Sequence, residues 1–291
     1  MGHRQHCLSF NGARLTIRRI AASKPFTLVI GPHRREFIMH SAKVAGLSPA
    51  LKALVNGPMR EGVEGRVEWD FLDDLSFLCF FNYAYTNRYD ATKIKADAKP
   101  GMSASSNPDL SVTTVLDTKM VVKFDDGQFT SRGWPVRQTS RVKPRKDILS
   151  KRAALWTHFC CLKKPRDDPD ERNEEAIIAG GELPPEQLVC NAKLYAFADY
   201  YGIEDLKVLA YNKLHKDLRD AAECRLRLSN VVSLLQYCCD RPVPDELKEL
   251  VVLYVACQFD NIWKEEGFQD LLATHGDLSV AIIGELRGLL E

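Results

Sequence analysis

The feature that most constrains the fold is a change of hydrophobic period within residues 26–85. Phe26, Leu28 and Ile30 alternate with Thr27 and Val29, residues 36–39 resume an extended run, and the Gly31-Pro32 pair between the two runs is a turn signal. This pattern predicts a hairpin of two short strands.

Directly after this hairpin the apolar residues take up a helical period. They recur three or four positions apart, at Val44, Leu47, Leu51 and Leu54. Ser48 suits a helix N-cap and Pro49 suits the first position of a helix, so we expect two short helices that meet here. Val67 and Trp69 then alternate with charged residues, which predicts a half-buried strand, and a helix should follow from about residue 72 to 84.

This order of elements resembles the BTB/POZ family. The residues that match the family pattern are Leu28 to Gly31, Phe37 to His40, Ser48, Met59 to Glu61, Val67 to Trp69, Tyr85-Thr86 and Tyr89. The chain departs from the pattern at Pro25, where many members carry an Asp that contributes to a charged pocket at the dimer interface, and at Ala50-Leu51, where an aromatic residue usually follows the Ser. The resemblance implies an α+β fold with a small mixed sheet capped by helices.

The two helices that should close such a domain come only after a long insertion. The stretch from Leu188 has a helical period and resembles the closing helix pair of the family, with Gly202 placed to end its first helix in a left-handed conformation. We therefore predict a split domain with these parts: residues 1–20 as a flexible N-terminus, 21–89 as the first part, 90–187 as a largely disordered insertion, 188–218 as the closing helix pair, and 219–291 as an all-α region.

The all-α C-terminal region is predicted from four stretches in which apolar residues recur at helical spacing. They span residues 228–238, 247–255, 268–272 and 278–286. The region resembles the helical tails of fungal BTB-domain proteins, and no Kelch, ankyrin or zinc-finger repeat is evident in the sequence. We expect these helices to pack on the split domain.

The insertion divides by composition. Residues 96–114 are rich in Ala, Ser, Pro and Thr, which is typical of disorder, and a hairpin is conceivable around Asp126-Gly127. Residues 132–166 hold eleven basic residues and one acidic residue. This excess predicts either a nuclear-import signal or a phosphate-binding arm, or else only a solvated loop whose charge the acidic residues of 167–175 neutralise. The basic residues that best fit an import signal lie in two short tracts and are Lys143, Arg145, Lys146, Lys163, Lys164 and Arg166.

Composition excludes several classes of protein. The formal net charge is +1, so there is no global attraction to nucleic acid or to a membrane surface, and no arginine–aromatic alternation indicates base reading. No apolar run approaches the roughly 20 residues that cross a bilayer, and the first residues lack a secretory signal. Nine cysteines without framework spacing indicate reduced thiols. We expect a cytoplasmic or nuclear protein with no membrane partner.

Neither catalysis nor metal binding is predicted. None of the common nucleotide, hydrolase or metalloprotease motifs occurs, and Cys160-Cys161 near His158 lacks C-x-x-C spacing, so we expect no enzyme activity, cofactor or metal. Asp73-Asp74 suit the positive end of a helix dipole better than acid–base chemistry. His40, at a strand-to-helix junction, should use a ring nitrogen to satisfy backbone groups.

Function is therefore expected to be binding. The resemblance implies a module for homo- or hetero-oligomerisation. It also implies a role as adaptor for a cullin-type ubiquitin ligase, because Met59-Arg60-Glu61 match a hydrophobic-x-Glu element that docks a cullin scaffold in the family. The alternative for these three residues is an ordinary loop before the strand. The alternative functions are a nuclear regulatory protein that uses the basic insertion and an enzyme whose site has no recognised motif; nucleic acid is not an expected partner.

Overall fold

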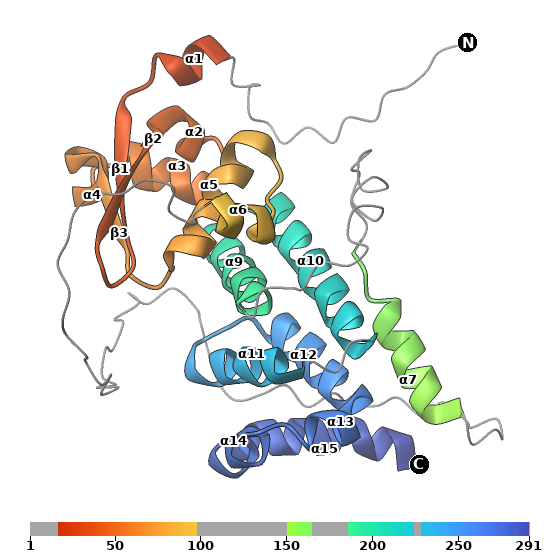
Figure 1. Cartoon of the computed structure of the whole chain (residues 1–291). Coiled ribbons are helices and arrows are strands. Elements are labelled where there is room, and N and C mark those ends of the chain that lie inside the picture. Colours follow the sequence, from red (N-terminus) through yellow and green to blue (C-terminus); the bar gives the residue numbers. More distant parts are fainter. Residues whose placement is uncertain (1–16, 98–149, 165–185, 224–227, 291) are drawn as a thin grey trace, which may run out of the picture.

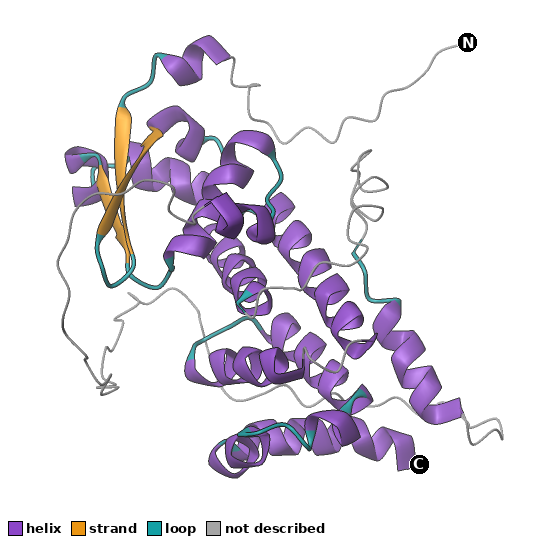
Figure 2. Cartoon of the chain, viewed as in Figure 1, coloured by secondary structure: helices purple, strands orange, loops and turns teal. Residues whose placement is uncertain are grey.

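The computed structural model describes residues 17–97, 150–164, 186–223 and 228–290, and the fold is α+β (Figure 1). Three strands form one small sheet, and helices make up most of the remaining described chain (Figure 2). The sheet and the first helices lie at one end, α9 (Gln187–Tyr201) and α10 (Glu204–Glu223) run through the middle, and the last helices lie at the other end (Figure 1).

The sheet confirms the predicted strands. β1 (Pro25–Ile30) and β2 (Arg35–His40) form the antiparallel hairpin, and β3 (Arg66–Trp69) pairs in parallel with the other edge of β1, which gives the order β2-β1-β3. Gly31 opens the turn at a φ of +65°, a conformation that favours glycine, and its N–H donates to the Trp69 carbonyl at 3.0 Å. The turn is thus tied to β3 as well as to its own strands.

One face of β1 builds the core. Phe26, Leu28 and Ile30 alternate toward it and are buried. Trp69 of β3 lies among aromatic rings, with its ring centroid 5.7 Å from that of Phe80 and 4.9 Å from that of Phe197. Phe197 follows the insertion in the sequence, so a single core joins residues from both sides of it.

The helices of the first part are α1 (Ile17–Ala21), α2 (Ser41–Ala45), α3 (Pro49–Asn56), α4 (Arg60–Glu64) and α5 (Asp74–Thr86). The predicted joint between α2 and α3 is confirmed: Ser48 is the N-cap, and the Leu51 N–H donates to its Oγ at 3.1 Å. α4 was not predicted. The expectation of an ordinary loop at residues 59–61 is wrong, because Met59 is an N-cap and the chain is helical from Arg60.

The closing pair consists of α9 (Gln187–Tyr201) and α10 (Glu204–Glu223). Gly202 lies between them at a φ of +63°, as its predicted C-cap role requires. α9 contacts α5, α10 and α11, and buried residues therefore occur around most of its circumference rather than on the single face that its periodicity predicts.

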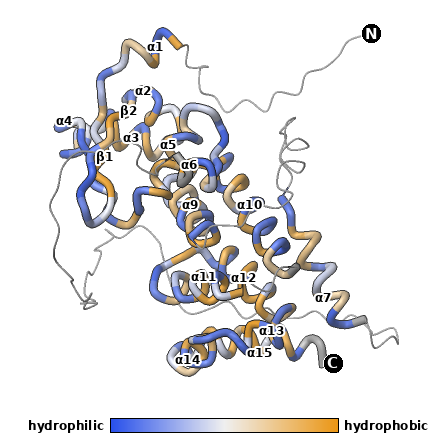
Figure 3. Tube along the Cα trace, viewed as in Figure 1, coloured by the Kyte–Doolittle hydropathy of each residue, from blue (hydrophilic) through white to orange (hydrophobic). Residues whose placement is uncertain are grey.

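The C-terminal region comprises α11 (Leu228–Asp240), α12 (Asp245–Cys257), α13 (Phe259–Ile262), α14 (Phe268–Thr274) and α15 (Gly276–Leu290). α11 packs on α9 and α10, and α12 contacts α10, as expected for helices that pack on the split domain, whereas α15 packs on α12. Hydrophilic and hydrophobic residues alternate along α10 and α15 (Figure 3), as expected for helices with one buried face. Ile283, predicted to be apolar core, is 62% exposed.

Two described pieces of the predicted insertion are helical. α6 (Ala91–Asp97) packs on α5 and α9, and α7 (Ser150–Cys160) packs on α12 and α15. The segment at 96–114 therefore begins inside a helix, and its remainder lies outside the described residues, as does the hairpin expected around Asp126-Gly127. Disorder is thus wrong for residues 91–97 and 150–160.

A buried polar network joins the two parts of the split domain. The Tyr89 hydroxyl donates to Asn191 Oδ1 at 2.8 Å, and Asn191 Nδ2 donates to Asp217 Oδ2 at 2.7 Å. Gln187 Nε2 donates to the same Asp217 oxygen at 2.9 Å, and Thr92 donates to Gln187 at 3.0 Å. The bonds of Tyr89 and Asn191 are buried, whereas the Thr92 bond is exposed, so the buried part of the network fixes residues about a hundred positions apart.

Candidate protein-interaction surface

The face of the sheet opposite the core carries charged residues in register. Val29 of β1 lies between Glu36 of β2 and Glu68 of β3, and Thr27 lies between Ile38 and Arg66. Side chains alternate from one face of a strand to the other, so these six residues share one face. We call them, together with Arg34 of the hairpin turn, the outer sheet face.

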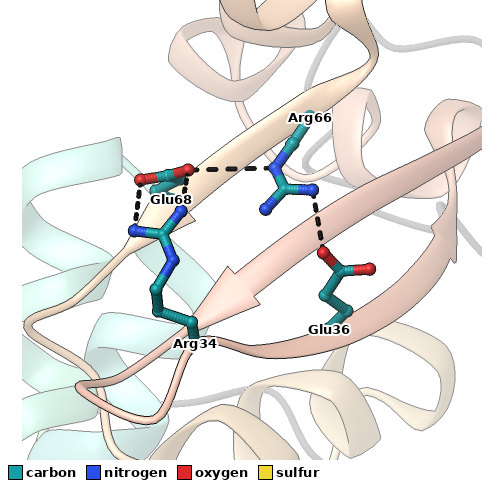
Figure 4. Close-up of polar contacts among 4 residues, drawn as sticks. All are labelled: Arg34, Glu36, Arg66 and Glu68. Atoms are coloured by element: carbon teal, nitrogen blue, oxygen red, sulfur yellow. Dashed lines mark hydrogen bonds and ion pairs between the residues drawn. The ribbon is translucent and has the colours of Figure 1, made fainter.

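Four charged residues of the outer sheet face form a continuous network across all three strands (Figure 4). Arg34 makes two hydrogen bonds to the Glu68 carboxylate, at 2.6 and 3.1 Å. Arg66 donates to Glu36 at 2.8 Å, and its Nε lies 3.8 Å from Glu68. The two arginines and two glutamates balance in charge, and the fork of Arg34 fits the carboxylate in the bidentate manner that fixes orientation.

The network covers an isolated apolar residue. Val29 is 2% exposed but lies outside the main hydrophobic core cluster, because it points away from Phe26 and Leu28. Its direct cross-strand neighbours are Glu36 and Glu68, whose aliphatic stems lie within reach of it. The ion pairs therefore hold long side chains flat over the strand.

Hydrogen bonds set the electrostatics of this face. The bonds from Arg34 lower the pKa of the Glu68 carboxyl, and the positive charges of Arg66 and Arg60 act in the same direction. The bond to Glu68 in turn raises the pKa of the Arg34 guanidinium. Both groups stay ionised across the physiological range, so the outer sheet face is a fixed array of charges. The influence of Arg60 on Glu68 also places the start of α4 beside the network.

α4 exposes two apolar side chains next to this array. Met59 is 68% exposed and Val63 is 76% exposed, and they are four positions apart, which places them on one side of the helical turn. Glu61, by contrast, is half-buried and lies near Tyr201. Burial raises the pKa of the Tyr201 hydroxyl, and the negative charge of Glu61 acts in the same direction. The three candidate residues 59–61 therefore do not share one face.

His40 and Tyr85 mark the other edge of the sheet. The His40 backbone N–H donates to the Tyr85 hydroxyl at 3.2 Å, and His40 Nδ1 lies 2.9 Å from the same oxygen. The expectation that the His40 ring satisfies backbone groups is therefore wrong, because the ring pairs with a phenol and makes no cap to α2. Its structural role at the strand-to-helix junction holds.

Asp73 and Asp74 behave as helix-start residues. The Ser76 N–H donates to Asp73 Oδ1 at 2.7 Å, which makes Asp73 the N-cap of α5, and Asp73 also pairs with Lys193 of α9. These contacts outweigh burial and lower the pKa of the Asp73 carboxyl. Asp74 pairs with Arg35 at 2.5 Å. Both carboxylates therefore have structural partners, as predicted.

The basic tract is described only in part. Lys143, Arg145, Lys146 and Arg166 lie outside the described residues. Lys163 is exposed, whereas the Lys164 ammonium lies 2.6 Å from Glu246 and 4.5 Å from the centroid of the Tyr211 ring. A side chain held in this way is bound to the helical body rather than extended into solvent.

Cysteines and other metal-ligating residues form no metal site in the described ranges. No group of three or more His, Cys, Asp or Glu residues there could hold a metal ion. Cys79 and Cys190 are buried, with their sulfur atoms 3.8 Å apart, and the contact with Cys190 together with burial raises the pKa of the Cys79 thiol. These thiols pack as small apolar side chains.

No protein-family model and no curated protein sequence matches this chain. The resemblance to the BTB/POZ family therefore stays a prediction. The structure shows a mixed α+β protein with a small three-stranded sheet. Within the described residues, no helix has the length and apolar character to cross a membrane.

The charged network of the outer sheet face was not predicted from the sequence, although the alternation of charged residues indicates part of it. The pair Arg66 and Glu68 alternates along β3, and this period of two places both on one face; in the pair Arg34 and Glu36 only Glu36 lies on a strand, because Arg34 belongs to the hairpin turn. That the two pairs meet follows only from the position of β1 between β2 and β3, which the sequence did not reveal.

Proposed function

We propose that this chain is a protein–protein interaction module with a BTB/POZ-like domain. The order of elements supports this proposal: a hairpin, two short helices, a parallel strand and a helix are completed by a closing helix pair that packs on them. The core that joins Trp69 with Phe197 gives such a module a rigid frame on which a binding surface can be held.

The exposure of Met59 and Val63 on α4 carries the proposal. These two apolar side chains are 68% and 76% exposed, and a partner that covers both removes their apolar surface from water. Beside them the outer sheet face presents charges that already pair internally, so a partner can add polar contacts at the rim without burying an unpaired charge.

The partner we propose is the N-terminal domain of a cullin scaffold, in an adaptor role for a ubiquitin ligase. Binding should be measured by calorimetry with the purified full chain and with a Met59→Ser/Val63→Ser double variant. We expect at least a tenfold loss of affinity, since two interface anchors of this size together contribute about 2 kcal/mol or more. Ile283→Ser is the matched control, because Ile283 is 62% exposed on α15, far along the chain.

Glu61→Lys provides a second test of the candidate residues. Because Glu61 is half-buried near Tyr201, the circular dichroism of the Glu61→Lys variant must match that of the native chain before binding is compared. Binding that is equal in the native chain, the double variant and Glu61→Lys would show that α4 is not the contact. If the native chain did not bind the cullin domain at all, the adaptor role would be refuted, but the same surface could still bind another protein.

The described residues add no support to the alternative of a nuclear regulatory protein. Lys164, the basic residue of that hypothesis with the best-defined position, is paired with Glu246. We therefore propose an interaction module without catalytic activity, whose oligomers and partners form through the surfaces above.

A further inference from the structure

Two buried thiols meet where the two parts of the split domain pack on each other. Cys79 lies in the middle of α5 and is 0% exposed, and Cys190 lies in the first turn of α9 and is 2% exposed. The Cys190 thiol donates to Cys79 Sγ at 3.8 Å, although the two residues are 111 positions apart in the chain. α5 precedes the insertion, α9 follows it, and the two helices contact each other. The thiol pair therefore spans the junction between the two parts.

Neighbouring contacts hold the two sulfur atoms in place. Asn191, the residue after Cys190, accepts a buried hydrogen bond from the Tyr89 hydroxyl at 2.8 Å. Lys193, further along α9, pairs with Asp73, which is the N-cap of α5. A disulfide needs its sulfur atoms about 2.05 Å apart, so the two thiols have to approach by roughly 1.8 Å from their present 3.8 Å. This movement is small because both helices are already fixed against each other.

Two other pairs of cysteines in the described ranges are adjacent in the sequence. They are Cys160-Cys161 and Cys238-Cys239. A bond between adjacent residues joins no separate elements and encloses no loop of the chain. A bond between Cys79 and Cys190 links positions that are 111 apart, and the restriction that a disulfide places on the unfolded chain grows with the length of the enclosed loop.

The environment of the pair determines which oxidant can reach it. The hydrogen bond from Cys190, together with burial, raises the pKa of the Cys79 thiol. A buried, protonated thiol reacts slowly with charged or bulky reagents, so the reagent has to be small and uncharged and to enter through transient local openings. Hydrogen peroxide meets both conditions. Once one sulfur is oxidised, the other is already in contact with it, which favours a disulfide over further oxidation.

We propose that Cys79 and Cys190 form a disulfide when the chain meets hydrogen peroxide, and that this bond locks the first part of the split domain to its closing helix pair. One sulfur attacks a peroxide oxygen and becomes a sulfenic acid, and one water is released. The second sulfur then displaces the hydroxyl group, which leaves with the thiol proton as a second water. The two thiols lose two electrons and two protons, and the peroxide is reduced. This inference goes beyond the proposed function and depends neither on α4 nor on a partner.

Mass spectrometry of the full-length chain tests the proposal. The folded chain is treated with hydrogen peroxide, denatured in the presence of iodoacetamide and digested with trypsin. Trypsin releases Cys79 in the peptide 67–88 and Cys190 in the peptide 173–193, and neither peptide contains another cysteine, so a linked pair identifies this bond. We expect the linked pair as the main oxidation product of both residues, and dithiothreitol should separate it. The melting temperature of the oxidised chain should rise by about 10 °C and return after reduction.

Cys79→Ala and, as a second variant, Cys190→Ala should lose both the linked peptides and the rise in melting temperature. Circular dichroism establishes that each variant is folded. Cys238→Ala is the matched control, because it removes an equally buried thiol from α11 and should keep both effects. Cys161 is exposed, so its oxidation shows that the peroxide was active. Recovery of Cys79 and Cys190 as free thiols or as sulfinic acids in that sample would overturn the disulfide, and linked peptides without a rise in melting temperature would overturn the lock.

Discussion

Stability should depend on pH through Asp217, which lies in the buried network between the two parts of the split domain. Burial raises the pKa of this carboxyl from 3.8 to about 7, although hydrogen bonds from Gln187 and the charges of Lys213 and Lys216 oppose the shift, and Asp220 adds to it. The folded state therefore favours the protonated acid. Its contribution to stability is fully present below the unfolded pKa and is lost as the pH rises toward about 7.

The size of the effect follows from the two pKa values. A difference of about three units corresponds to about 4 kcal/mol between the acid and alkaline limits, of which about 2–3 kcal/mol falls between pH 5 and pH 8. Asp217→Asn keeps an acceptor for the Gln187 and Asn191 amides, which both donate to one oxygen, but carries no charge. We expect the variant to gain stability relative to the native chain by this amount as the pH rises.

Urea unfolding at pH 5, 6, 7 and 8 measures this difference, with circular dichroism as the probe. Asp205→Asn is the matched control, since it removes the same charge from the same helix at an exposed position in the first turn. A difference between Asp217→Asn and the native chain that stays constant from pH 5 to pH 8 would refute the reasoning, because the carboxylate would then be ionised throughout or solvated.

Two further predictions concern helix ends. Ser48→Ala should lower the free energy of unfolding by about 1 kcal/mol, because the Leu51 N–H loses its only side-chain acceptor at the start of α3; Ser229→Ala, at an exposed position of α11, is the control in the same urea titration. Gly202→Ala should cost about 1 kcal/mol, because the φ of +63° strains an alanine although no atom lies within 4 Å of an added Cβ. Gly202→Asn should cost less, and equal losses for the two would mean that the strain is not conformational.

Much of the first part of the fold could be predicted from the sequence. The strands at 26–30 and 67–69, the cap at Ser48 and the left-handed Gly202 were correct because each depends on residues within a few positions of it. α4 was missed, since a helix of five residues that contains Gly62 and ends at Gly65 leaves almost no periodic signal. The exposure of Met59 and Val63, on which the candidate surface rests, follows from that short helix.

Long-range pairing could not be predicted. Phe159 lies in a basic stretch that has the composition of a solvated loop, yet the contacts with His215 and Tyr254 bury it completely. Lys164 was a candidate import residue on charge alone, and its position next to Glu246 depends on how α12 packs. Neither outcome has a local signal, because burial is a property of the side chains that surround a residue.

The sequence by itself determined the three strands, the joint of α2 and α3 at Ser48 and the end of α9 at Gly202, since capping, turn geometry and hydrophobic period act over three or four residues. Only the tertiary structure decided that β1 lies between β2 and β3, that the Asp217 carboxyl is buried, and that α7 of the insertion packs on α12 and α15. The physical reason is that desolvation and ion pairing depend on groups that are distant in the sequence, such as Tyr89 and Asn191, 102 residues apart, and Lys164 and Asn212, 48 residues apart.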